Sequence, residues 1–126
     1  MDQPTKIQYF TDLFAWKKGH ELVLKIYIIT KTFPREEIYA LVDQMRRCGI
    51  SITSNIAEGF SRKSYKEKIQ FYSMALGSTT ELQNQILVAK DVGYITQEQF
   101  LALSDLMLEI HKLLNGLIKS SRKYLI

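Results

Sequence analysis

The chain has 126 residues, of which 46% are hydrophobic and 24% charged, and its 17 Lys and Arg against 13 Asp and Glu give a net charge of +4. This composition is typical of a globular protein and excludes a disordered or fibrous chain. The length predicts a single domain over residues 1–126, which can fold around a hydrophobic core without disulfides.

The first half of the chain predicts two helices. Six glycines and two prolines are too few for an all-β protein, so we expect long helices. The first spans about residues 11–32 and ends at Phe33-Pro34, because a residue that precedes proline avoids the helical conformation. Pro34 then begins a second helix, which we expect to reach Glu58, with Gly59 as its stop.

The second half predicts two more helices. Ser64-Tyr65-Lys66-Glu67 has the spacing of a capping box and starts a third helix, which Gly93 ends near residue 91 or 92. A second box, Thr96-Gln97-Glu98-Gln99, starts a fourth helix that runs to about Tyr124. Four helices with short connections predict an all-α fold, an antiparallel up-and-down four-helix bundle.

Apolar side chains recur at helical spacing on the second and fourth predicted helices, and we interpret both stripes as core. The stripe on the second helix contains Ile38, Leu41, Val42, Met45, Gly49, Ile52 and Ile56. The stripe on the fourth contains Leu103, Leu106, Met107, Ile110, Leu113, Leu114 and Leu117. The first and third helices are apolar on several sides. Because a monomeric bundle needs one buried stripe per helix, we expect a homo-oligomer with interfaces on these two helices.

A polar face runs along the second predicted helix. Its members, at spacings of four, three and four, are Arg47, Ser51, Ser54 and Glu58. We interpret this face as solvated or as an interface, with a hydrogen-bond path from the arginine to the glutamate. Asn55 lies at the edge of the apolar stripe, and we expect it to bond to Ser78 or Glu81 across the bundle.

The sequence offers little support for catalysis, a metal or a cofactor, so we predict none of them. A serine nucleophile needs a base within hydrogen-bond reach, and neither His20 nor His111 is near Ser51 or Ser54 in sequence. A hydrolase would require one of them to lie beside a serine in space. No Glu-x-x-His pair of the di-iron bundles occurs, and Gly59 lacks the other residues of a phosphate-binding loop.

Basic residues occur in two groups that can attract phosphates. The first group and its neighbours on the second helix are Arg62, Lys63, Lys66, Lys68, Arg46 and Arg47; the second group is Lys119, Arg122 and Lys123. We expect the two groups at opposite ends of the bundle. The candidate nucleic-acid-binding residues are Arg46, Arg47, Arg62, Lys63 and Lys66, with Tyr65 available for base stacking. The alternative is that these cations only solvate exposed ends.

Cysteine usage and hydropathy predict a cytoplasmic location. A lone thiol, Cys48, excludes an internal disulfide framework and fits a reducing compartment. The first ten residues lack the pattern of a signal peptide. The longest uncharged stretch, residues 69–80, is too short and too polar to cross a bilayer, so we expect no membrane partner.

Several segments of the chain are distinctive when they are taken together. The most specific are Phe33-Pro34 to Glu37-x-Tyr39, Arg46-Arg47 and Ser51-x-x-Ser54-Asn55-Ile56-Ala57-Glu58-Gly59. Others are Leu13-x-Ala15-Trp16, Gly77-Ser78, Glu81-Leu82 and Gly93-Tyr94. Together they resemble the four helix bundle protein family, whose founding members are the 23S ribosomal RNA intervening sequence proteins (S23-like). Where relatives often have Tyr-Gly-Leu-Thr, this chain has Tyr39-Ala40-Leu41-Val42.

The resemblance implies a four-helix bundle that assembles as a homopentamer and has no catalytic constellation. It also implies motif positions with a structural role, namely Ser51, Ser54, Asn55, Glu58, Gly59 and Glu81. Distant relatives are accessory proteins that bind a reverse transcriptase and nucleic acid. The leading hypothesis is therefore an oligomeric accessory protein that binds RNA or DNA, and the alternative is a protein-protein assembly scaffold without nucleic-acid contact.

Overall fold

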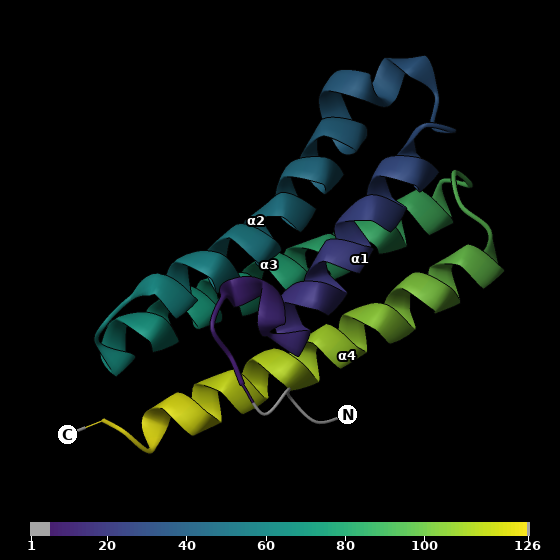
Figure 1. Ribbon diagram of the computed structural model, residues 1–126. Coiled ribbons are helices and arrows are strands. Elements are labelled where there is room, and N and C mark those ends of the chain that lie inside the picture. Colours follow the sequence, from purple (N-terminus) through teal and green to yellow (C-terminus); the bar gives the residue numbers. More distant parts are fainter. Residues whose placement is uncertain (1–5, 126) are drawn as a thin grey trace.

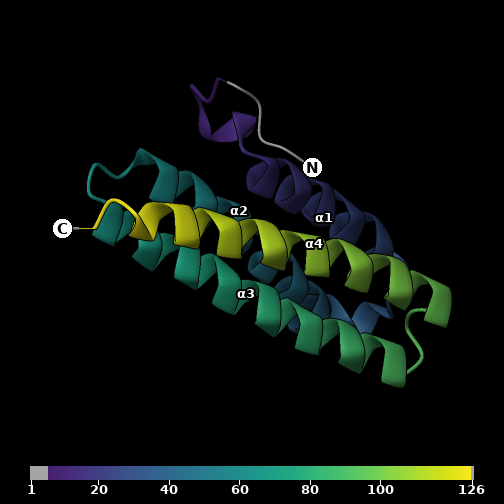
Figure 2. The ribbon, with the colours of Figure 1, turned by 90° about the horizontal axis from the view of Figure 1, so that it is seen from below.

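Four long helices run alternately up and down the molecule (Figure 1). In the computed structural model, which describes residues 6–125, they are α1 (Phe14–Thr30), α2 (Asp43–Ser61), α3 (Tyr65–Asp91) and α4 (Gln97–Arg122). Each helix contacts two neighbours, and Figure 2 shows α4 lying between α1 and α3. The described residues contain no strand, so the predicted all-α fold of four helices is confirmed.

The first helix begins later than predicted. A short 3-10 turn, Phe10–Asp12, precedes it, because the Asp12 carboxylate accepts hydrogen bonds from the backbone N–H groups of Gln8 and Tyr9, at 2.9 and 3.0 Å. Leu13 then adopts an extended conformation and buries its side chain in the core. The hydrogen bonds of Asp12 and the buried side chain of Leu13 together separate the 3-10 turn from α1.

The second predicted helix begins with two irregular turns. Pro34 caps the 3-10 turn Arg35–Glu37, and a π-helical turn, Ile38–Val42, leads into α2. Glu37 holds this region: its carboxylate accepts a 2.8 Å hydrogen bond from the Tyr94 hydroxyl and a weaker one from the backbone N–H of Leu41. The contact ties the start of the second helix to the connection between α3 and α4.

Gly59 is not the stop of α2, which continues to Ser61 and ends where Arg62 becomes extended. Gly59 is buried inside the last turns, where a Cβ atom would lie 2.7 Å from Cε1 of Tyr72. The glycine therefore permits α2 and α3 to approach closely. The Lys68 ammonium donates to the carbonyl oxygens of Gly59 and Phe60, at 3.3 and 2.7 Å, and so satisfies free carbonyls at the end of the helix.

The remaining helix signals agree closely with the structure. Ser64 Oγ accepts from the backbone N–H of Glu67 at 3.1 Å and caps α3. Gly93, with a φ of 89°, follows its last turn as predicted. The capping box of Thr96 and Gln99 is complete at the start of α4. This helix ends at Arg122, followed by a turn, two residues before the predicted end.

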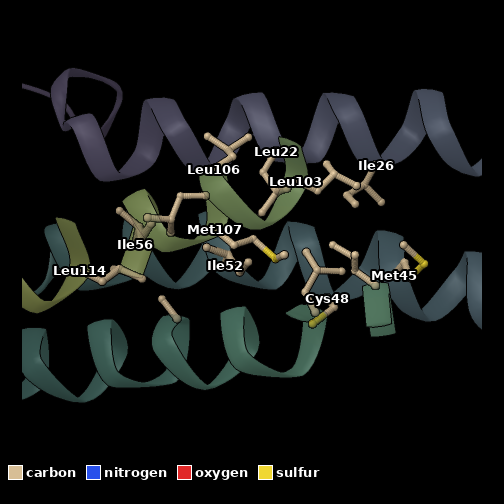
Figure 3. Close-up of a cluster of buried hydrophobic side chains, with 14 of the residues drawn as sticks. Leu22, Ile26, Met45, Cys48, Ile52, Ile56, Leu103, Leu106, Met107 and Leu114 are labelled. Carbon is tan, nitrogen blue, oxygen red and sulfur yellow. The ribbon is translucent and has the colours of Figure 1, made fainter. Parts of the chain in front are cut away.

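Most of both predicted stripes form the core between the helices. Figure 3 shows side chains from α1, α2 and α4 pointing toward one another, including Leu22, Ile52 and Met107. Ile38 is an exception, with 45% of its surface exposed, because it lies in the π-helical turn and not on the face of α2. Leu41, Leu113 and Leu117 pack at the edge of the core.

Large apolar side chains remain exposed on all four helices. They are Leu24 and Ile28 on α1, Ile50 on α2, Tyr65, Met74, Leu87 and Val88 on α3, and Leu101 and Leu108 on α4. The first and third helices are thus apolar outside the core, as their sequence patterns predict. No helix in the described part of the chain combines the length and the hydropathy that a membrane span requires.

Candidate nucleic-acid interface

The two basic groups lie at the same end of the bundle, and the prediction of opposite ends is wrong. The Tyr65 ring, in the first turn of α3, stacks on the Tyr124 ring after α4, with centroids 4.8 Å apart and an angle of 23° between the planes. Figure 2 shows the connection between α2 and α3 beside the carboxyl end of α4. The chain reverses direction between α3 and α4, so the start of one helix and the end of the other must meet.

We call this region the basic end, defined by Arg62, Lys63, Lys66, Lys119, Arg122 and Lys123. The four lysines among these residues are exposed, and none of them pairs with an acid within residues 6–125. No Asp or Glu follows Glu109 in the sequence, so the last turns of α4 carry only positive charge. The acids near the basic end include Glu58, which pairs with Arg62, and the exposed Glu67 in the first turn of α3. The far end of the bundle carries more acids, including Glu36, Glu37, Asp43, Asp91 and Glu98.

Arg62 is the most firmly held cation of the basic end. Its guanidinium donates a 2.7 Å hydrogen bond to the Glu58 carboxylate and lies 4.6 Å from the centre of the Phe71 ring. Its Nε is buried without a hydrogen-bond partner in the described part of the chain. The Glu58 carboxylate offsets part of the Arg62 charge, so the exposed lysines are better placed to contact a phosphate.

Arg46 and Arg47 lie in the first turns of α2, away from the basic end. The Arg46 guanidinium donates to Thr30 Oγ1 at 3.0 Å and to the Tyr27 carbonyl oxygen at 3.3 Å, and lies 4.5 Å from the Tyr27 ring centre. Through these contacts, Arg46 joins α2 to α1. Arg47 is 80% exposed at its side chain and pairs with Asp43 at 3.1 Å. The structure therefore brings together only three of the five candidates, Arg62, Lys63 and Lys66.

The polar face of α2 is divided among local partners and forms no path from Arg47 to Glu58. Arg47 bonds to Asp43 and Glu58 bonds to Arg62, each four residues away on the same side of the helix. Ser54 is exposed between them. The path is absent because each charged side chain has a nearer opposite charge one turn away.

Ser51, and not Asn55, connects α2 to α3. The hydroxyls of Ser51 and Ser78 share a 2.9 Å hydrogen bond. The Asn55 amide instead donates to the Ser51 carbonyl oxygen at 2.8 Å and to Ser51 Oγ at 3.1 Å. The expected bond from Asn55 to Ser78 or Glu81 is replaced by this one, because the carbonyl one turn earlier lies within reach of a short amide.

A cleft of about 270 Å³ lies between α2 and α3 beside this serine pair. Its lining residues are Gln44, Arg47, Cys48, Ser51, Ser78, Glu81 and Gln85. The Cys48 thiol donates to the Ser78 carbonyl oxygen at 3.0 Å and lies 3.8 Å from a Glu81 carboxylate oxygen. Burial, and then the nearby Glu81 carboxylate, raise the pKa of Cys48 to about 12. No local pattern in the sequence indicates this contact, which depends on how α2 and α3 align.

The histidines lie apart from the serines of the polar face. His20 stacks on Trp16 with ring centroids 4.7 Å apart, and His111 Nε2 lies 3.4 Å from Thr80 Oγ1. Neither hydrogen bonds to Ser51 or Ser54 within residues 6–125. In the same residues, no three His, Cys, Asp or Glu side chains gather as a metal ion would require.

Comparisons with known proteins give consistent results. The family model described as "23S rRNA-intervening sequence protein" matches residues 11–116. A crystal structure from Bacteroides thetaiotaomicron, described as a protein with unknown function from the S23 ribosomal protein family, is 28% identical to the chain, with a TM-score of 0.77. The match covers 83% of this chain and 95% of that chain. No curated protein matches the chain. Lys119, Arg122 and Lys123 lie beyond the last residue that the family model matches.

Proposed function

Since the chain belongs to the 23S rRNA-intervening sequence protein family, we propose that it is a non-enzymatic accessory protein that binds RNA or DNA through the basic end of its bundle. The observation that carries this proposal is the meeting of two basic groups that are far apart in the sequence. Lys63 and Lys66 lie beside the start of α3, and Lys119, Arg122 and Lys123 lie on and just after the end of α4. Clustered cations attract phosphates, and the attraction weakens as salt concentration rises.

The proposed absence of catalysis rests on the positions of the histidines. A serine hydrolase needs a base that accepts the hydroxyl proton, and the polar face of α2 has no such base bonded to Ser51 or Ser54 among the described residues. The Ser51 hydroxyl already shares a hydrogen bond with Ser78. These contacts support a structural role for the serines of the family motif.

We further propose that the protein acts as a homo-oligomer. The exposed apolar side chains on α1 and α3, such as Ile28 and Met74, support this proposal, since their burial between copies removes apolar surface from water. The family resemblance implies five copies. An oligomer would present the basic end several times, and each additional phosphate contact would strengthen binding and steepen its salt dependence.

The function is tested by measuring the binding of fluorescent RNA and DNA oligonucleotides at about 50 and 200 mM salt. We expect binding that weakens steeply with salt. The triple variant Lys63→Gln/Lys66→Gln/Lys123→Gln should lose most of the affinity. Its matched control neutralises three exposed cations outside α1, α3 and the basic end, Arg35→Gln/Arg47→Gln/Lys112→Gln, and should retain the affinity.

Equal losses in the two triple variants would show that net charge matters and the basic end does not. Salt-independent binding, or none, would contradict the proposed function. All six substitutions are at exposed positions, so we expect the helices of each variant to stay intact. Circular dichroism checks this.

The second candidate function is an assembly scaffold, favoured by the exposed apolar residues on α1, α3 and α4. In this case, those faces would bind a protein partner, such as the reverse transcriptase that the family resemblance implies. A pull-down with and without nuclease distinguishes the two functions. A partner that is lost after nuclease treatment supports nucleic-acid binding, whereas one that is retained supports the scaffold.

A further inference from the structure

We propose that the Tyr65–Tyr124 pair is a stacking platform for an unpaired base, so that the basic end binds single-stranded nucleic acid in preference to duplex. This inference rests on the proposed function and names the form of nucleic acid that the same surface takes. It follows from the position, the exposure and the surroundings of the two rings.

The two tyrosines are held in place by the ends of two helices. Tyr65 is the first residue of α3, directly after the Ser64 cap, and Tyr124 lies in the turn that follows α4. Their rings are 4.8 Å apart and within 23° of parallel. Each ring limits the motion of the other, so the pair forms a preorganised aromatic surface, which lowers the entropy lost when a base binds.

The pair stays open to solvent although its members stack. Tyr124 is 59% exposed and Tyr65 is 38% exposed. The stack uses one face of each ring, and the remaining surface is available to another flat group. Nucleobases stack on such rings whatever their sequence, because every base has a π-face.

Cations surround this aromatic surface on both chain segments. Lys63 and Lys66 flank Tyr65, and Arg122 and Lys123 directly precede Tyr124; all four side chains are on the surface. A base on the rings would therefore place its neighbouring phosphates within a positively charged region. This combination of a stacking surface and a basic groove or rim is typical of proteins that bind single strands.

Duplex cannot use the rings in the same way. Its bases are already stacked and paired, so only the phosphates can reach a surface tyrosine along most of its length. The basic end would then bind duplex by charge alone. Stacking and charge do not depend on the ribose hydroxyl, so we expect single-stranded RNA and single-stranded DNA to bind comparably.

The experiment measures binding of the full chain to single strands and duplexes of about 20 nucleotides by fluorescence anisotropy, with RNA and DNA versions of each. Tyr124→Leu removes the π-face and keeps apolar bulk, whereas Tyr124→Phe keeps the π-face and removes only the hydroxyl. The matched control is Tyr39→Leu, because Tyr39 is 95% exposed in the π-helical turn far from the basic end.

We expect wild-type protein to bind single strands more tightly than duplex. Tyr124→Leu should weaken single-strand binding about tenfold and leave duplex binding unchanged, while Tyr124→Phe and Tyr39→Leu should retain wild-type affinity. A fluorescent base analogue in the strand should be quenched on binding to wild type and not to Tyr124→Leu. This second measurement reports stacking directly and does not depend on affinity.

The failure of this inference can be told apart from the failure of the proposed function. Salt-dependent binding with no preference for single strands, or with no effect of Tyr124→Leu, overturns the stacking platform and leaves nucleic-acid binding intact. Absence of binding to every oligonucleotide overturns both. In a further outcome, wild type binds single-stranded RNA more tightly than single-stranded DNA and still quenches the base analogue. That result would support the stacking platform and contradict only the expectation that RNA and DNA bind with equal affinity.

Discussion

Gly59 lies directly against the Tyr72 ring, where a Cβ atom would come within 2.7 Å of Cε1 and 2.9 Å of Cδ1. Tyr72 is only 3% exposed and belongs to the core cluster, so the ring has little space into which it can move. This contact sets the distance between the end of α2 and the start of α3. Because the basic end is built on these two segments, the contact also helps to position Lys63 and Lys66.

We predict that Gly59→Ala destabilises the protein by about 1–3 kcal/mol, because the added methyl group must displace a packed ring. The matched control is Gly77→Ala in α3, where a Cβ atom meets nothing within 4 Å. That change should stabilise the protein by about 0.5–1 kcal/mol, since alanine favours a helix over glycine. Urea denaturation measures both. Equal effects of the two substitutions would contradict the close approach.

Substitutions of Arg46 and Lys66 should show that one residue contributes to stability and the other to nucleic-acid binding. Arg46→Met removes the bonds to Thr30 and Tyr27, and we expect a loss of about 1–2 kcal/mol in the free energy of unfolding with unchanged affinity for nucleic acid. Lys66→Gln should leave the melting temperature unchanged and reduce the salt slope of binding by about 1. Thermal denaturation and salt titrations test the pair. If Arg46→Met lost affinity for nucleic acid and kept its stability, Arg46 would be shown to contribute to binding.

Cys48 should react slowly with alkylating reagents. Its pKa is raised from 9.0 to about 12, so the reactive thiolate is scarce near neutral pH. At about pH 8, we expect native protein to react with iodoacetamide at least about a hundredfold more slowly than urea-unfolded protein. Mass spectrometry follows the reaction, and similar rates in the two states would contradict the buried contact with Ser78.

The raised pKa of the same thiol predicts how the stability of the protein depends on pH. The folded state holds the Cys48 proton more tightly than the unfolded state, whose thiol has the ordinary pKa of 9.0. The contribution of Cys48 is therefore fully present below pH 9.0 and is lost as the pH rises toward 12. Denaturation of wild type and Cys48→Ala across this range should give a steeper decline for wild type. Parallel declines would show that Cys48 does not contribute.

The oligomer proposal predicts that a charge on α1 dissociates the assembly. Ile28 is 66% exposed, so Ile28→Glu should leave the fold of one copy intact and place a carboxylate in the interface, where its desolvation is costly. Sedimentation at micromolar concentration should give a 14.7 kDa species for the variant and a larger one for wild type. Gln44→Glu, at an exposed position on α2, is the control. A wild-type mass of one copy would refute the oligomer.

Local signals in the sequence predicted the helices well where the structure depends on neighbouring residues. Ser64, Gly93 and the box of Thr96 and Gln99 act within one or two turns, and each lies where its pattern indicates. Gly59 misled the prediction because its local meaning, the end of a helix, differs from its use in a close approach to Tyr72. Asn55 is the reverse case, because a partner across the bundle was predicted and the observed partner lies in its own helix.

The sequence by itself determined that this chain forms four long helices, because capping bonds and apolar periodicity act over a few residues. Tertiary structure alone decided which distant side chains meet: Tyr65 with Tyr124, Cys48 with Ser78, and Arg46 with Tyr27. The physical reason is that these contacts depend on the direction and alignment of whole helices. A shift of one turn along the bundle would change every partner while leaving each helix unchanged.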